Sequence, residues 1–146
     1  MKLSLLKKII EIKTSTIAME IKDNTAIIDS LREYGSQSGE PVYIWKKMFG
    51  LYRTDLPHVA LPSTQTYKQT LKYINKNNTG HVFALIGFNE YLNDADTIYI
   101  LKTIKTREDY KNKILLIDQK VEIPSALKGK IMETKKFLRY KQKTEV

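Results

Sequence analysis

Three lysines in the middle of the chain have the spacing of an anion-binding helix face. Lys68, Lys72 and Lys76 recur every four residues, so a helix over 64–77 would place all three ammonium groups on one side. No carboxylate lies within that segment to neutralise them. The stripe therefore either receives an anion or forms an ordinary solvated face.

A second group of cations is interleaved with aromatic residues between positions 43 and 53. The cations are Lys46, Lys47 and Arg53, and four rings lie among them. Cations that contact phosphates, together with rings that stack on bases, are typical of a single-strand nucleic-acid surface. The alternative is that the rings enter the core while the lysines face water, because large aromatic side chains are mostly buried.

The most basic element is expected at the end of the chain. Pro124 is typical of a first helical position, and apolar residues at helical spacing extend the predicted helix to about residue 140. The cations that we assign to its binding face are Lys128, Lys135, Lys136 and Arg139.

The net charge of +9 is unevenly distributed along the 146 residues. Residues 40–80 carry a net +4 and residues 124–146 a net +5, whereas residues 81–123 carry a net −1. If the two basic segments fold onto neighbouring surfaces, they form one positive face that attracts polyanions.

These observations predict a small, basic, non-catalytic protein of the cytoplasm that binds nucleic acid or a protein–nucleic acid complex. The expected partner is RNA, DNA or an acidic protein surface. No membrane partner is expected, since no apolar run reaches the roughly 18 residues of a membrane span. The predicted binding residues are Lys46, Lys47, Arg53, Lys68, Lys72, Lys76, Lys128, Lys135, Lys136 and Arg139.

Two alternative functions belong to other classes. A metal-independent ribonuclease needs only a base, a cation and a supporting hydroxyl or phenol, because the 2′-OH of RNA is the nucleophile. The residues of the right chemical types are His58, Tyr67, Lys68, Lys72 and Arg139. The second alternative is an inhibitor or immunity-type module that binds an acidic partner protein.

No metal site and no cofactor are predicted. The chain has no cysteine and only two histidines, which excludes thiolate and histidine-rich metal sites and suits a reducing compartment. Asp118 and Lys120, with Asp96 upstream, have the residue types of a divalent-cation site. Asp96, however, lies in an expected turn, where aspartate is favoured for local hydrogen bonds.

Short apolar segments predict the sheet that would position these residues. The segments 81–88, 97–104 and 113–118 are rich in β-branched and aromatic residues and are bounded by turn residues. We expect three consecutive antiparallel strands, because the intervening breaks are too short for a crossover helix. A helix that begins at Ser63 or Thr64 and ends near Asn77 would pack on this sheet.

The N-terminal part is predicted to be largely helical. Helices are expected over 3–13 and 25–34, with the second ending at Gly35. Residues 14–33 can be arranged as a helix-turn-helix, although the stretch 16–21 also alternates well enough to be a strand.

The glycine- and serine-rich stretch 35–41 divides the chain into two expected parts. Residues 1–39 would form an N-terminal helical segment with the helix-turn-helix arrangement, and residues 40–146 an α+β body with a basic C-terminal helix. The predicted fold class is thus α+β. N-terminal helices precede a mostly antiparallel sheet of three to four strands, packed with one central and one C-terminal helix.

Overall fold

The computed structural model describes residues 1–135, in which six strands form a single sheet of order β3-β2-β4-β5-β1-β6. The strands are β1 (Thr16–Glu20), β2 (Val42–Lys46), β3 (Gly50–Arg53), β4 (Val82–Ile86), β5 (Lys113–Asp118) and β6 (Met132–Glu133). The helices are α1 (Leu3–Ile10), α2 (Asn24–Ser38), α3 (Tyr67–Lys76) and α4 (Ala95–Thr106), with 3₁₀ turns η1 (Asn89–Tyr91) and η2 (Ser125–Leu127).

The sheet is mostly parallel. β2 pairs with β4, β4 with β5, β5 with β1, and β1 with β6, all in parallel register. Only β3 runs antiparallel, as the second strand of a hairpin with β2. The fold is therefore α/β, with crossover helices between parallel strands.

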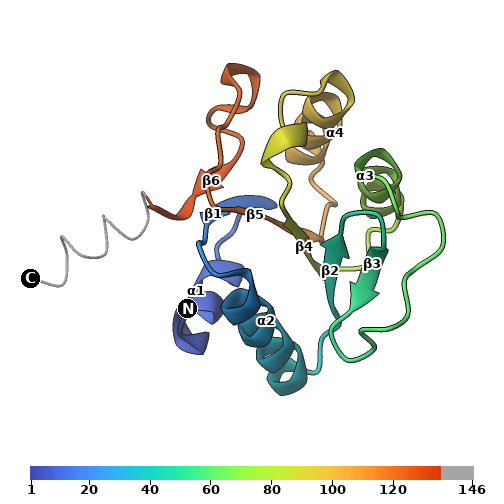
Figure 1. Ribbon diagram of the computed structural model, residues 1–146. Coiled ribbons are helices and arrows are strands. Elements are labelled where there is room, and N and C mark those ends of the chain that lie inside the picture. The colour runs from blue at the N-terminus through green and yellow to red at the C-terminus, as the bar shows by residue number, and fades with distance from the viewer. Residues whose placement is uncertain (136–146) are drawn as a thin grey trace, which may run out of the picture.

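Helices cover both faces of this sheet. Figure 1 shows α1 and α2 on one side, with α3, α4 and the loop that leads to β6 on the other. Successive residues of β5 point to opposite layers: Ile114 and Leu116 pack with α3 and α4, whereas Leu115 and Ile117 pack with α1 and α2. Strands buried on both faces have unbroken apolar sequences, and this accounts for the runs at 82–86 and 113–117.

The expectation of a mostly antiparallel sheet with three to four strands is wrong. The predicted first and third strands are present as β4 and β5, but the predicted middle strand, 97–104, lies within α4. Because α4 supplies the crossover, β4 and β5 lie side by side in parallel instead of forming a meander.

Tertiary packing explains why the strand-like residues of α4 form a helix. Thr97, Leu101 and Ile104 are separated by four and three residues, and all three are buried. The Asp94 carboxylate caps the helix, accepting hydrogen bonds from the backbone N–H groups of Asp96 and Thr97 at 3.1 and 3.3 Å. The cap and the buried face together outweigh the preference of Ile98 and its β-branched neighbours for a strand.

The N-terminal part has no helix-turn-helix at residues 14–33, because Thr16–Glu20 is the strand β1. The helices on either side are present as α1 and α2. α2 runs beyond the expected end at Gly35 to Ser38, and Gly39 follows in the left-handed conformation with a φ of 72°. The expected division after residue 39 stays a prediction, and β1 from the first part is hydrogen bonded to β5 from the second.

The expected C-terminal helix does not begin at Pro124. Residues 124–133 instead contain the single turn η2 and the short strand β6, and helical conformation is found only at the last two described residues, Thr134 and Lys135. Gly129, with a φ of 80°, lies between η2 and β6 in a conformation that a helix does not continue through. Residues 136–140 of the predicted helix lie outside the described residues.

The outer edge of β3 is covered by the chain that follows it. Leu61 donates a backbone hydrogen bond to Leu51 at 2.8 Å, and Ala60 pairs with Tyr52. The buried Thr64 fixes this loop, since its hydroxyl accepts from the Leu51 N–H at 2.9 Å and donates to the Leu61 carbonyl at 2.8 Å. Covering an edge in this way prevents it from pairing with another chain.

Within residues 1–135, no helix combines the length and the apolar character that crossing a lipid bilayer would require.

Candidate functional site

A basic groove lies on the α4 side of the sheet, between α4 and the segment that leads to β6 (Figure 1). It consists of a larger hollow of about 790 Å³ and a smaller one of about 310 Å³. The two hollows share Lys13, Thr14 and Lys105 and therefore adjoin. We call them together the basic groove.

Nine cations and three carboxylates line the basic groove. The cations are Lys13, Lys105, Arg107, Lys111, Lys113, Lys120, Lys128, Lys130 and Lys135. The carboxylates are those of Glu20, Glu122 and Glu133, and all three line the larger hollow. The positive charge of the protein is thus concentrated along one side of α4.

Part of this charge is neutralised within the protein. Lys135 pairs with Glu20 at 3.0 Å, and Lys120 pairs with Glu122 at 3.5 Å. Across residues 1–135, in contrast, Lys13, Lys105 and Lys128 form no ion pair. The groove therefore keeps uncompensated cations where the two hollows adjoin and within the larger hollow.

Apolar side chains form part of the wall of the larger hollow. Val121 and Ile131 are almost fully buried and belong to the core on the α4 side of the sheet. Met132, which is 37% exposed, also lines the hollow. A ligand of the larger hollow would accordingly meet both cations and apolar surface.

Hydrogen bonds hold the cations of the smaller hollow in place. Lys113, at the start of β5, donates to the carbonyls of Ile12 and Thr14. Arg107, which follows α4, donates to the backbone carbonyl and to the side-chain oxygen of Asn75, both at 3.2 Å. These bonds hold three parts of the chain together at one corner of the sheet: the connection between α1 and β1, the end of α3 and the end of α4.

A second surface with exposed apolar residues lies at the β2–β3 hairpin. Met48, Leu56 and Val59 are between 50% and 82% exposed. They flank a hollow of about 380 Å³ that is lined by Lys46, Phe49, Tyr52, Pro57 and His58.

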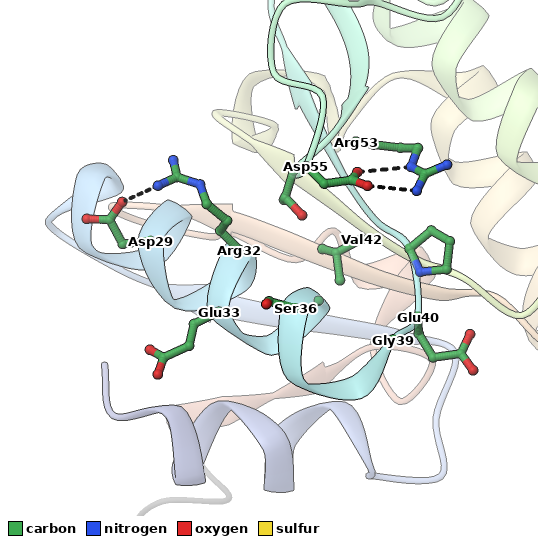
Figure 2. A pocket seen from close by; sticks show the side chains of 12 residues that line it. Asp29, Arg32, Glu33, Ser36, Gly39, Glu40, Val42, Arg53 and Asp55 are labelled. Atoms are coloured by element: carbon green, nitrogen blue, oxygen red, sulfur yellow. Dashed lines mark hydrogen bonds and ion pairs between the residues drawn. The ribbon is translucent and has the colours of Figure 1, made fainter.

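A third hollow, of about 750 Å³, lies between α2 and the β2–β3 hairpin (Figure 2). Its cations are paired within the protein: Arg32 with Asp29 at 3.4 Å, and Arg53 with Asp55 at 2.8 Å. Two further carboxylates line it, so its wall has an excess of acids over bases. Its charge is therefore opposite to that of the basic groove.

Two of the four rings of the 43–53 stretch pack in the core. Trp45 is 1% exposed, and its indole Nε1 donates to the Thr64 carbonyl at 3.0 Å. Tyr43 is also buried and stacks on Phe83, with a centroid separation of 5.1 Å. Phe49 and Tyr52 stay partly exposed. The alternative in which the rings enter the core therefore holds for Tyr43 and Trp45 and not for Phe49 and Tyr52.

The predicted cationic residues do not form one face. Lys68 pairs with Asp96 of α4 at 3.3 Å, and Lys47 pairs with Glu90 at 3.0 Å. Lys72 and Lys76 are exposed on α3, which is separated from the β6 side of the sheet by α4 (Figure 1). Of the predicted C-terminal cations, Lys128 and Lys135 line the basic groove, while Lys136 and Arg139 lie outside the described residues.

The residues of the ribonuclease alternative are also dispersed. His58 lines the hollow at the β2–β3 hairpin, and none of Tyr67, Lys68 and Lys72 lines it. Tyr67 instead stacks on Tyr91, with a centroid separation of 4.1 Å. Arg139 lies outside the described residues.

The predicted binding residues leave out seven of the nine cations of the basic groove. One is Lys130, in the basic segment 124–146. The other six are Lys13, Lys105, Arg107, Lys111, Lys113 and Lys120. They come from two segments whose summed charges are close to zero, 1–39 and 81–123. The sequence contained a signal for two of these cations: Lys113 begins a strongly apolar strand, and Lys111 lies two residues before it. Their meeting with Lys13 depends on the parallel pairing of β1 and β5, which was not predicted.

The family comparison identifies the class of protein. Residues 3–135 match the model of the family described as SpoVK-like AAA ATPase, N-terminal domain. The match covers most of the 146 residues, and the chain therefore belongs to this family. Searches of curated proteins and of solved structures found no significant match.

This membership corrects the functional expectation. A chain of the SpoVK-like AAA ATPase N-terminal domain family is an AAA-ATPase-related protein. It is not the small nucleic-acid-binding protein that its charge predicted. The 146 residues contain no G-x-x-x-x-G-K-[ST] sequence of the P-loop type, and we place no nucleotide in the basic groove.

Proposed function

We propose that this chain is a protein-recognition domain of an AAA-ATPase-related protein, and that its basic groove docks an acidic segment of a partner protein. The single observation that carries this proposal is the groove itself. It combines nine cations with an apolar wall along one side of α4. The family membership supplies the context, a domain that accompanies an ATPase.

The mixture of charges in the larger hollow favours a protein over a nucleic acid. Glu20, Glu122 and Glu133 lie among its six cations. A continuous phosphate backbone would be repelled at these carboxylates, because every repeat unit carries the same negative charge. A peptide can place glutamate or aspartate against the lysines and an amide or an apolar side chain beside the carboxylates.

The expected affinity is modest and depends on salt. Exposed ion pairs contribute roughly 0.2–1 kcal/mol each, so a few lysines do not suffice for tight binding. Contacts with Val121, Ile131 and Met132 would add to this, at about 25 cal/mol per Å² of buried apolar surface. Opposite charges on the two partners would chiefly raise the association rate.

The location proposed for this interaction is the cytoplasm. The chain has no cysteine, which suits a reducing compartment. The partner would be a protein of the same compartment with glutamate- or aspartate-rich segments on its surface.

The test is the binding of a labelled peptide in which glutamates alternate with leucine and valine. Fluorescence anisotropy should detect binding to the 146-residue chain that weakens when salt is raised from about 50 to 200 mM. The double variant Lys128→Glu with Lys130→Glu should bind at least about tenfold more weakly, because it reverses two charges of the larger hollow.

The matched control is Lys72→Glu with Lys76→Glu, which makes the same charge change on the exposed face of α3. It should retain most of the affinity, because neither residue lines the basic groove. The two double variants change the net charge of the protein equally, so any loss of general attraction for the peptide is the same in both. Equal losses in the two double variants would mean that net charge, and not the groove, attracts the peptide, and the proposal would then be wrong.

A further inference from the structure

The smaller hollow of the basic groove differs from the larger one in having no carboxylate. Its ten lining residues include five cations: Lys13, Lys105, Arg107, Lys111 and Lys113. Asp109 interacts with Arg107 at 3.4 Å but is not among the residues that line the hollow. Five positive charges around about 310 Å³ repel one another unless an anion enters.

Two of the five cationic side chains of this hollow are held in position before any ligand arrives. The guanidinium group of Arg107 is anchored on Asn75 and lies over the ring of Tyr110, at 5.5 Å from its centroid. Lys113 is anchored by the carbonyls of Ile12 and Thr14. Because these two side chains are already ordered, binding of an anion would cost little side-chain conformational entropy at these positions.

A buried hydroxyl at the hollow has no partner. The Tyr110 hydroxyl lies beside Asn112 and forms no hydrogen bond of normal geometry within residues 1–135. The Asn112 amide is already engaged, since its Nδ2 donates to the carbonyls of Ile74 and Asn77. A buried donor without an acceptor destabilises the protein, and a ligand oxygen that reaches the hydroxyl would supply the missing acceptor.

Burial also affects the charge states in the hollow. It raises the pKa of Tyr110 to about 12, so the phenol remains a proton donor near neutral pH. It lowers the pKa of Lys113 to about 8, which means that this ammonium group is destabilised by loss of water. A multiply charged anion nearby would offset that desolvation.

We propose that the smaller hollow is a binding site for a phosphate group. A phosphate monoester carries about −1.5 to −2 charges and three strong acceptor oxygens, which match several ammonium donors, a guanidinium group and a phenol better than a single carboxylate does. The phosphate can belong to a phosphorylated side chain of the groove's partner or to a free phosphate compound. The site is the smaller part of the basic groove and shares Lys13 and Lys105 with the larger hollow. Its use by a phosphorylated partner rests on the proposed docking, whereas its binding of a free phosphate compound does not.

The first experiment titrates the ¹⁵N-labelled 146-residue chain with inorganic phosphate and follows amide shifts and affinity by NMR. Lys111→Gln removes an exposed cation of the hollow, and Tyr110→Phe removes only the hydroxyl. Each variant should weaken phosphate binding about three- to tenfold. Lys102→Gln changes an exposed lysine of α4 outside the hollow and should leave the affinity unchanged.

The second experiment identifies the source of the phosphate. It compares the acidic peptide described above with a version that contains one serine and with the same peptide phosphorylated at that serine. A gain of about tenfold or more on phosphorylation, lost in Lys111→Gln, would support a phosphorylated partner. Saturable binding of inorganic phosphate without such a gain would support a free phosphate compound.

The outcomes for the two proposals can be told apart. Lys128→Glu with Lys130→Glu should weaken the unphosphorylated peptide but leave inorganic phosphate binding within about twofold, because neither residue lines the smaller hollow. Absence of phosphate binding together with no gain on phosphorylation would overturn the phosphate site alone. Phosphate binding that is equal in wild type, Lys111→Gln and Tyr110→Phe would overturn it as well.

Discussion

At the scale of residues, a few buried polar side chains determine how the basic groove is built. Asn112 is 2% exposed, and its Oδ1 accepts hydrogen bonds from the backbone N–H groups of Thr79, Gly80 and His81 at 2.9–3.2 Å. Its Nδ2 donates to two carbonyls at the end of α3. One side chain therefore joins α3, the start of β4 and the start of β5.

Asn112→Ala should lower the free energy of unfolding by about 3 kcal/mol, since five buried or partly buried backbone groups would lose their partner. Urea denaturation measures this change. Asn78→Ala is the comparison, because Asn78 is more exposed and hydrogen bonds only to Asp109 and Lys111. A loss for Asn112→Ala no larger than for Asn78→Ala would contradict the role assigned to Asn112.

Burial of Lys113 should make the free energy of unfolding depend on pH. Burial lowers its pKa to about 8 in the folded protein, whereas its ordinary value is 10.5. Between pH 8 and 9.5 the unfolded chain therefore binds more protons than the folded one, and stability rises with pH. The slope should stay well below about 1.4 kcal/mol per pH unit, because solvent reaches part of the side chain.

The measurement is the free energy of unfolding at pH 8.0 and 9.5 for wild type, Lys113→Met and Lys111→Met. Lys113→Met should lack the rise, and the exposed Lys111→Met should keep it. The window stops at pH 9.5 because burial raises the pKa of Tyr110 to about 12, and that group makes stability fall with pH above its ordinary value of 10. Parallel curves for all three proteins would count against a buried ammonium group at Lys113.

At the scale of elements, the β3 edge depends on Thr64 and the loop that it fixes. Thr64 is fully buried, and its hydroxyl bonds to the backbone of both Leu51 and Leu61. Gly50 allows the close approach, because a Cβ at this position would lie 2.8 Å from the Thr64 hydroxyl oxygen. A glycine, a hydroxyl and a short loop together complete an edge that would otherwise expose unpaired backbone groups.

Thr64→Val should lower the free energy of unfolding by about 2–4 kcal/mol and leave the Leu51 amide without its partner. Hydrogen exchange at Leu51 should accelerate more than exchange in α2 on the far side of the sheet. Thr103→Val, on α4, removes a hydroxyl that bonds only to the carbonyl of its own helix, and it should cost little. Unchanged exchange at Leu51 would show that Thr64 does not hold the edge.

The elements differ in how far the sequence could predict them. The positions of α1, α3, β4 and β5 followed from apolar spacing and turn residues, because each has a strong local pattern. The sequence analysis missed α4 because Thr97, Ile98 and Ile100 favour a strand locally. The segment forms a helix because Asp94 caps it and one of its faces is buried. That single error changed the sheet from parallel to antiparallel, since a crossover was replaced by a turn.

At the scale of the whole molecule, the position of charge in space differs from its position in sequence. Residues 81–123 have a net charge of −1, yet they supply five of the nine cations of the basic groove. Most acids of the same segment lie elsewhere on the surface, such as Asp96 beside Lys68. Summed charges could not reveal this separation, because it arises only when β5 pairs with β1 and α4 packs above them.

The most direct test of the account is to map where the acidic peptide binds. Adding the alternating glutamate peptide to the ¹⁵N-labelled chain should shift the amide signals of Lys105, Lys128 and residues 130–133. The shifts should become smaller with increasing distance from the groove. Amides of α3 and of the β2–β3 hairpin should change little. Shifts concentrated on α3 or the hairpin, or spread evenly over the surface, would contradict the claim that the basic groove is the docking site.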